Sequence, residues 1–167
     1  MMSVDALQVK AHAKINITLD VLHKRADGYH EVSMIMQAID LHDTVSLKKQ
    51  NGDITVEANI PALACDDSNL AYRAARLVKE NCHIAAGVHI VLDKQIPLAA
   101  GLAGGSSNAA AVLKGMNQLW QLGLTQAELE TMGASLGSDI PFCLRGGTML
   151  ATGRGEILTP LPAMESI

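Results

Sequence analysis

Apolar and polar residues alternate strictly near the beginning of the chain, from residue 14 to residue 21. Side chains of a strand point to its two faces in turn, so this alternation predicts a half-buried strand. The polar face of the strand carries Lys14 and Asn16. The half-buried face is expected to carry Ile15, Ile17, Leu19 and Val21.

The same kind of pattern predicts further strands along the chain. They are expected over residues 32–36, 44–48, 53–58, 88–92 and 148–151. Asn51-Gly52 lies between the strands expected at 44–48 and 53–58. This pair of residues is typical of a tight hairpin, so we expect those two strands to be neighbours.

Helical periodicity predicts three helices. Apolar residues share one face over residues 68–81, 109–120 and 125–136. Thr125 and Glu128 form a capping-box pattern at the start of the last helix, and Gly137 is placed to end it. The order of strands and helices predicts an α+β fold, with helices covering one face of a mainly antiparallel or mixed sheet.

Composition supports one soluble globular domain. The chain has 167 residues, of which 49% are hydrophobic and 18% charged. Aromatic residues are scarce, so aliphatic residues and eight methionines are expected to fill the core. The net charge of −4 argues against a nucleic-acid partner. The first ten residues lack the apolar core of a signal peptide, and no apolar stretch is long enough to span a membrane. The three separated cysteines suggest reduced, buried thiols, so a cytoplasmic protein is expected.

A glycine-rich segment precedes the second predicted helix. It reads Pro97-Leu-Ala-Ala-Gly101-Leu-Ala-Gly104-Gly105-Ser106-Ser107-Asn108. Glycines let a backbone approach a ligand closely, and a helix N-terminus has unpaired N–H groups that suit a phosphate. The segment lacks the lysine of a Walker loop and the glycine spacing of a dinucleotide fingerprint. It is either a phosphate loop of another kind or a turn that uses glycine only for close packing.

Two polar residues are candidates for catalysis. Asp139 lies between Gly137 and Pro141 and could act as a base that accepts a proton from a substrate hydroxyl during phosphoryl transfer. A nearby Lys14 would keep that carboxylate ionised and offset charge on the phosphoryl group. On position alone, a solvent-facing strand lysine is favoured for Lys14, and a lone aspartate such as Asp139 is most often a turn or cap residue.

The segment Asp27-Gly-Tyr-His30 combines a turn with an aromatic ring and an imidazole. Tyr29 and His30 could stack on and hydrogen-bond a planar base. Taken singly, Tyr29 is also compatible with the edge of a core and His30 with the surface.

Four of these motifs together resemble a known family. They are Ala13–Leu19, the string Lys-Arg-Ala-Asp-Gly-Tyr-His at 24–30, the glycine segment and Leu136–Pro141. In this order they are similar to those of the 4-diphosphocytidyl-2-C-methyl-D-erythritol kinases. That family belongs to the superfamily of galactokinase, homoserine kinase, mevalonate kinase and phosphomevalonate kinase.

The resemblance implies a fold, an activity and a site. The fold would be the N-terminal kinase domain that is similar to domain 2 of ribosomal protein S5. The activity would be ATP-dependent phosphorylation of the 2-hydroxyl of a cytidine-diphospho sugar alcohol in the non-mevalonate isoprenoid route, with Mg²⁺ expected beside ATP and no protein ligand for it assigned. Asp139 would be the base and Lys14 its partner, and Asn16, Tyr29 and His30 would bind the substrate. ATP would lie against Asn69, Lys94, Pro97, Leu98, Ala99, Ala100, Gly101, Leu102, Ala103, Gly104, Gly105, Ser106, Ser107 and Asn108.

The resemblance also predicts the domain organisation. Residues 1–160 would form the ATP-binding domain, and residues 161–167 would begin a linker to a C-terminal domain that this chain does not contain. Asn108 replaces an aspartate common in the family and so loses its charge. Two alternatives remain: a non-catalytic S5-like module that binds RNA or protein, and a kinase of the same superfamily that acts on another small alcohol.

Overall fold

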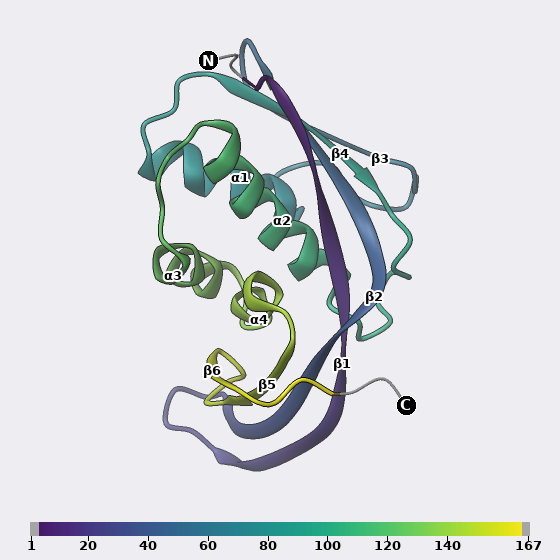
Figure 1. Cartoon of the computed structure of the whole chain (residues 1–167), viewed down its shortest axis with the longest axis vertical. Coiled ribbons are helices and arrows are strands. Elements are labelled where there is room, and N and C mark those ends of the chain that lie inside the picture. Colours follow the sequence, from purple (N-terminus) through teal and green to yellow (C-terminus); the bar gives the residue numbers. More distant parts are fainter. Residues whose placement is uncertain (1–3, 165–167) are drawn as a thin grey trace.

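Two long strands form the frame of the molecule. The computed structural model describes residues 4–164. Strand β1 (Ala6–Lys24) and strand β2 (His30–Gln50) are antiparallel and run the length of the molecule as one curved hairpin (Figure 1). The strands predicted at 32–36 and 44–48 are therefore parts of a single element.

Strand β2 organises a mixed sheet. One half of its second edge pairs with β4 (Gly87–Asp93) and the other half with β5 (Thr148–Thr152), both antiparallel. Strand β3 (Ile54–Ala58) pairs in parallel with β4, and β6 (Ile157–Pro160) pairs antiparallel with β5. The mixed sheet confirms the predicted fold class.

The hairpin predicted at Asn51-Gly52 is wrong. β3 does not pair with β2, because β4 lies between them in the sheet. Strand β3, helix α1 (Leu70–Asn81) and strand β4 form a parallel strand–helix–strand unit instead. Gly87, at the start of β4, allows this arrangement, since a Cβ atom there would lie 2.3 Å from the backbone oxygen of Asp53.

The helices cover one face of this sheet (Figure 1). The described residues form α1, α2 (Gly104–Leu119), α3 (Gln126–Leu136) and α4 (Ile140–Arg145). The first three confirm the predicted helices, and the capping box of Thr125 and Glu128 is present. Helix α4 was not predicted, because six residues are too short to show a helical period. None of the helices within residues 4–164 is long and apolar enough to cross a membrane.

Helix α2 lies at the centre of the core. It packs against α1 and against β1 and β2 of the sheet, and a Cβ atom at Gly115 would lie 2.3 Å from Leu47 Cδ1 of β2. A second, smaller apolar cluster joins the lower part of β2 to β5 and α4. It contains Met34, Met36, Phe142, Met149 and Ala151. Methionine therefore fills part of the core, as the scarcity of aromatic residues predicts.

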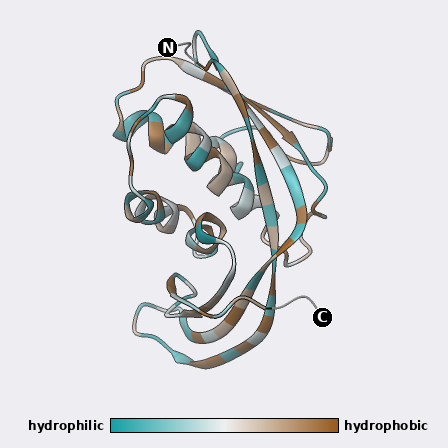
Figure 2. Cartoon of the chain, viewed as in Figure 1, coloured by the Kyte–Doolittle hydropathy of each residue, from teal (hydrophilic) through white to brown (hydrophobic). Residues whose placement is uncertain are grey.

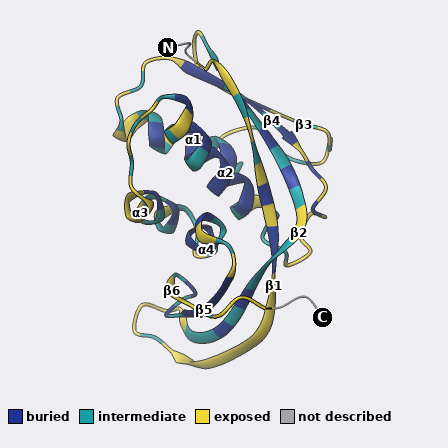
Figure 3. Cartoon of the chain, viewed as in Figure 1, coloured by how far each residue is buried: buried dark blue, intermediate teal, exposed yellow. Residues whose placement is uncertain are grey.

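The lower half of β1 is exposed on both faces (Figure 3). The prediction that its apolar residues are half-buried is wrong: Ile17 is 43% exposed, Leu19 54% and Val21 61%. Figure 2 shows hydrophobic residues along this part of the hairpin. The helices cover the upper half of the sheet, so within the described residues nothing packs on this stretch. The prediction for the cysteines also needs correction, since all three are free but only partly buried.

Candidate active site

Residues 97–103 of the glycine-rich segment form the end of the loop between β4 and α2, and residues 104–108 begin α2. The backbone of the loop turns through left-handed conformations at Ala99, Gly101 and Ala103, which have φ values of 54°, 74° and 58°. Ala103 is the N-cap of α2 and supplies no side-chain hydrogen bond to the first turn. The N–H groups of that turn are therefore available to an anion, and the helix dipole favours one there.

Two hydrogen bonds fasten this loop to strand β1. The backbone N–H of Lys14 donates to the carbonyl oxygen of Leu102 at 3.1 Å. The Ser107 hydroxyl donates to the carbonyl oxygen of His12 at 2.6 Å. These bonds hold the start of α2 against the part of β1 that carries Lys14.

The loop, the lysine and the aspartate line one pocket. Its volume is about 420 Å³, and its lining includes Lys14, Lys94, Leu70, Asp139 and residues 97–106 of the loop. Lys14 is 6% exposed, and its ammonium group donates to Asn16 Oδ1 at 3.1 Å. Lys14 is thus not the solvent-facing lysine that its position alone allowed.

Asp139 enters the pocket from the start of α4. It is the N-cap residue of this helix, but its side chain makes no capping hydrogen bond. The carboxylate is therefore not engaged in local structure. Its charge acts on Cys143, one turn along α4: burial first, and then the negative charge of Asp139, raise the pKa of the Cys143 thiol to about 12. At neutral pH this thiol is protonated, which excludes it as a thiolate nucleophile.

A buried ionic cluster lies at the base of the loop and supports it. Lys94 Nζ donates to Asp43 Oδ2 at 2.5 Å and to Asn108 Oδ1 at 3.0 Å, and Asn108 Nδ2 donates to Asp43 Oδ2 at 2.8 Å. The other carboxylate oxygen of Asp43 accepts the backbone N–H groups of Gln95 and Ile96. The predicted nucleotide residues Lys94 and Asn108 thus lie at the base of the loop, and Lys94 also lines the pocket.

Asp43 was missed by the sequence analysis. Its carboxylate is fully buried and is the centre of this cluster. A signal for its burial was present in the sequence. Asp43, Val45 and Leu47 occupy alternate positions of one strand, so they share a face, and that face packs on the core. A carboxylate on the buried face of a strand needs a cation or several hydrogen-bond donors.

Asn69 acts in local structure. It is the N-cap of α1, where its side chain accepts from the N–H of Ala71 and donates to the carbonyl oxygen of Ala64. Its neighbour Leu70 lines the pocket, whereas Asn69 is not among the lining residues.

Tyr29 and His30 lie away from the loop pocket, at the turn of the β1–β2 hairpin. Tyr29 is 57% exposed, so it is not at the edge of a core. The Arg154 guanidinium lies 4.9 Å from the centre of its ring. The turn is braced by Arg25, which donates to Glu31; this hydrogen bond lowers the pKa of the Glu31 carboxyl. Arg154 therefore covers one face of the Tyr29 ring, and the rest of the ring is open to solvent.

Comparison with known proteins identifies a family that part of the chain matches. Residues 69–147, which include the glycine loop and Asp139, match the family described as the GHMP kinases N terminal domain. The chain therefore contains a stretch that matches the GHMP kinase N-terminal domain. This match confirms the resemblance found in the sequence.

Comparison with individual proteins points to one kind of kinase. The chain is 56% identical over 158 residues to the 4-diphosphocytidyl-2-C-methyl-D-erythritol kinase of Brevibacillus brevis, covering 94% of this chain and 54% of that protein. It is 57% identical over 159 residues to the enzyme of the same name from Geobacillus kaustophilus, covering 94% and 55%. A crystal structure of 4-(cytidine 5'-diphospho)-2C-methyl-D-erythritol kinase superimposes with a TM-score of 0.81 at 37% identity, covering 93% of this chain and 55% of that one. The chain spans about half the length of the curated relatives it matches.

Proposed function

We propose that this chain is the N-terminal, ATP-binding half of a 4-diphosphocytidyl-2-C-methyl-D-erythritol kinase. The observation that carries the proposal is the presence of Lys14, Asp139 and the glycine loop in the lining of one pocket. The high identity to relatives of that name supports the choice of substrate. The activity would be phosphorylation of the 2-hydroxyl of the cytidine-diphospho sugar alcohol.

The loop and α2 would bind the phosphates of ATP. The free N–H groups of the first turn of α2 would donate to phosphate oxygens, and the turns at Ala99 and Gly101 would let the backbone wrap around them. Lys94 would act mainly through its support of the loop, because its charge is already balanced by Asp43. Asn69 and Asn108 would likewise position backbone rather than contact the nucleotide strongly.

Lys14 and Asp139 would carry the chemical step. The Asp139 carboxylate would take the proton of the substrate 2-hydroxyl, and the oxygen would attack the γ-phosphorus of ATP. The bond between the γ-phosphorus and the oxygen bridging to the β-phosphorus then breaks, and ADP leaves. Lys14 would offset the charge on the transferring group, held in position by Asn16.

Magnesium would enter with ATP and neutralise the charge of its phosphates. This ion needs oxygen ligands and keeps several waters, so one carboxylate together with phosphates is a suitable donor set. Among the described lining residues of the pocket, Asp139 is the carboxylate. Because the proposal uses Asp139 as the base, phosphate and water oxygens would supply most of the ligands.

Tyr29 and His30 would recognise the cytosine. The exposed ring of Tyr29 can stack on a base with the face that Arg154 does not cover, and His30 can hydrogen-bond the edge of the base. Residues 1–160 would form the kinase domain, and 161–167 would begin a linker to a second domain. Of these last seven, residues 165–167 lie outside the described residues. Three unpaired cysteines fit a reducing compartment such as the cytoplasm.

The test compares the wild type with Asp139→Asn in a chain extended to the length of the relatives. We expect Asp139→Asn to lower turnover by about 10²- to 10⁴-fold, the contribution of a positioned base, with ATP affinity nearly unchanged. Asp20→Asn, on the exposed part of β1, is the matched control and should retain full turnover. A large loss of ATP affinity in Asp139→Asn would show a structural aspartate instead. Absence of ATP binding in the extended wild type, with salt-dependent RNA binding, would favour a non-catalytic module.

A further inference from the structure

A pair of histidines faces each other across β1 and β2, outside the active site. His12 lies directly opposite His42 in the strand register, and the centres of their rings are 5.2 Å apart. Asp40 lies two residues before His42 on the same strand. One side-chain atom able to bind a metal from each of these three residues lies within 4.8 Å of the others. None of the three lines the glycine-loop pocket.

An irregularity in the strand pairing brings the three side chains together. The register changes from His12 opposite His42 to Lys14 opposite Ala38. Residues 39–41 of β2 therefore lie opposite one residue of β1, Ala13. A bulge of this kind redirects side chains from their regular alternation, and such irregularities are common beside functional sites.

Backbone hydrogen bonds define which nitrogen of each ring is free. The Nδ1 atom of His12 lies 3.0 Å from the carbonyl oxygen of Ile39, and the Nδ1 atom of His42 lies 2.7 Å from the carbonyl oxygen of Asp40. A carbonyl oxygen only accepts, so in both rings Nδ1 carries the hydrogen. The Nε2 atom then has an unshared electron pair. Metal-binding histidines are typically oriented in this way, with the second nitrogen bonded to a backbone carbonyl.

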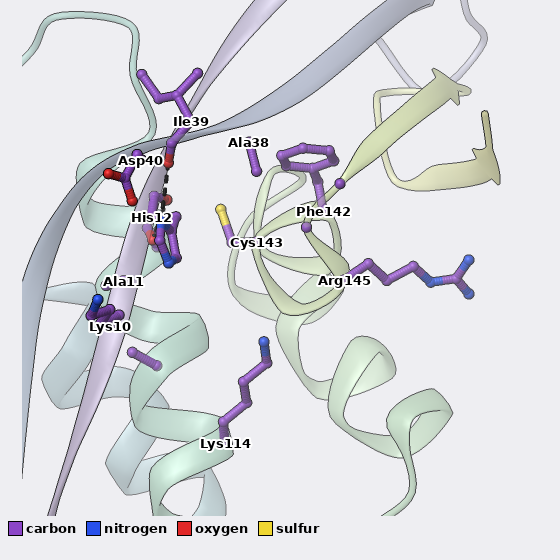
Figure 4. Close-up of a pocket in the computed structure, with 14 residues that line it drawn as sticks. Lys10, Ala11, His12, Ala38, Ile39, Asp40, Lys114, Phe142, Cys143 and Arg145 are labelled. Carbon is purple, nitrogen blue, oxygen red and sulfur yellow. Dashed lines mark hydrogen bonds between the residues drawn. The ribbon is translucent and has the colours of Figure 1, made fainter. Parts of the chain in front are cut away.

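Figure 4 shows two of the three residues, His12 and Asp40, in the lining of a pocket. The dashed line joins the His12 ring to the carbonyl of Ile39, and the carboxylate of Asp40 lies beside it at the edge of a pocket of about 440 Å³. Asp40 and His12 are exposed, so an ion can reach the cluster and keep water in its remaining positions.

We propose that His12, Asp40 and His42 form a binding site for a divalent transition-metal ion of the zinc type. Two imidazoles and one carboxylate are a donor set that suits Zn²⁺. They do not suit Mg²⁺, which prefers oxygen ligands, so this site is separate from the Mg²⁺ that accompanies ATP. The ion would connect β1 and β2 at their irregular pairing. The carbonyl oxygen of His12 also accepts the Ser107 hydroxyl at the start of α2, so the ion would stiffen the strand next to the loop.

Binding of Zn²⁺ alone to the purified 167-residue chain tests the proposal. Competition with a chromophoric zinc chelator in excess Mg²⁺ should give one equivalent of bound zinc. His12→Ala and His42→Ala should each lower the affinity by at least about tenfold, because each removes one of three ligands. His83→Asn is the matched control, since His83 is an exposed histidine with a left-handed φ of 53° that asparagine accepts readily, and it should bind zinc as the wild type does.

Thermal unfolding supplies a second measurement. An ion that binds only the folded chain raises the melting temperature, so Zn²⁺ should raise it in the wild type and in His83→Asn but not in the double variant His12→Ala, His42→Ala. Circular dichroism without metal should be the same in all variants. The proposal is overturned if zinc does not bind, if Mg²⁺ displaces it, or if the alanine variants bind it as tightly as the control. ATP binding by His42→Ala should be unchanged, so the outcome is independent of the proposed kinase activity.

Discussion

Lys14 and Lys94 are both buried beside the glycine loop, but their charges have different surroundings. Lys94 is paired with the Asp43 carboxylate and bonded to Asn108. Within the described residues, the ammonium group of Lys14 has only the neutral Asn16 amide as a hydrogen-bond partner. The charge of Lys14 is therefore available to a phosphoryl group, whereas the charge of Lys94 is used to hold the loop.

The ion pair of Lys94 gives a prediction for stability. Lys94→Met leaves the Asp43 carboxylate buried without a cation, so we expect the free energy of unfolding to fall by about 3–5 kcal/mol. Urea denaturation measures the loss. Lys48→Met, at an exposed position of β2, is the control and should change stability by less than about 0.5 kcal/mol. Equal effects of the two substitutions would show that the pair does not support the loop.

The open ring of Tyr29 gives a prediction for substrate binding. In a chain extended to the length of the relatives, Tyr29→Ala should raise KM for the cytidine substrate about 5- to 150-fold, the range expected for loss of one base–aromatic stack. The KM for ATP should not change. Tyr29→Phe keeps the ring and should behave like the wild type in steady-state assays. An equal rise in KM for the cytidine substrate and for ATP would mean that the ring does not contact cytosine.

Among the elements, those with local signals were predicted and those fixed by distant contacts were not. Helix α3 was found with its cap because Thr125 and Glu128 are three residues apart. The motifs that carry Lys14 and Asp139 are also local. Asp43 was missed because its partners Lys94 and Asn108 are 51 and 65 residues away, and the order of β3 and β4 was missed because a turn pair does not reveal an inserted strand.

Helix α3 should show a pH-dependent contribution from its cap. Hydrogen bonds from the backbone and side chain of Thr125 lower the pKa of Glu128. A pKa lower in the folded than in the unfolded chain stabilises the fold above the unfolded value, and this contribution is lost as pH falls through the folded value. Glu128→Gln should therefore melt below the wild type at pH 7, and the difference should vanish well below pH 4. A difference between Glu128→Gln and the wild type that persists in acid would contradict the assignment.

Helix α2 should reject a methyl group at Gly115. Alanine normally favours a helix by about 1 kcal/mol over glycine, but here its Cβ would lie 2.3 Å from Leu47 Cδ1, and overpacking costs about 1–3 kcal/mol. We expect Gly115→Ala to lower the melting temperature by roughly 2–4 °C per kcal/mol lost. In the same helix, Gly105→Ala meets its nearest side-chain atom at 3.7 Å and should be neutral or stabilising. A rise in melting temperature for Gly115→Ala would show that the sheet yields easily.

At the scale of the whole molecule, the sheet is only half covered. The helices pack on its upper part, while the apolar residues of the lower β1 face solvent (Figure 3). The alternation in the sequence identified the strand correctly but could not say whether another element packs on it. Since the relatives are about twice as long, we propose that their second half covers this surface.

Substitutions on that surface should act only in the longer protein. Leu19→Lys with Val21→Lys should leave the unfolding free energy of the 167-residue chain within about 0.5 kcal/mol of the wild type, because both residues are already exposed. In the extended chain the same pair should be destabilising, since it would bury two charges. Ile157→Lys, at an exposed position of β6, is the control. If the extended chain is equally stable with and without the two lysines, the surface is exposed in the extended chain as it is in the 167-residue chain.

Two consecutive residues of β2, His42 and Asp43, point to opposite sides of the sheet. His42 pairs with His12 on one side, and Asp43 is buried with Lys94 on the other. Deleting or inserting a single residue just before them would send the carboxylate to solvent and an imidazole into the core. Deleting or inserting two residues would keep both side chains on their present sides. The bulge opposite Ala13 is a place where the strand pairing can accommodate two more or two fewer residues. Length variation among related chains should therefore occur there in even steps.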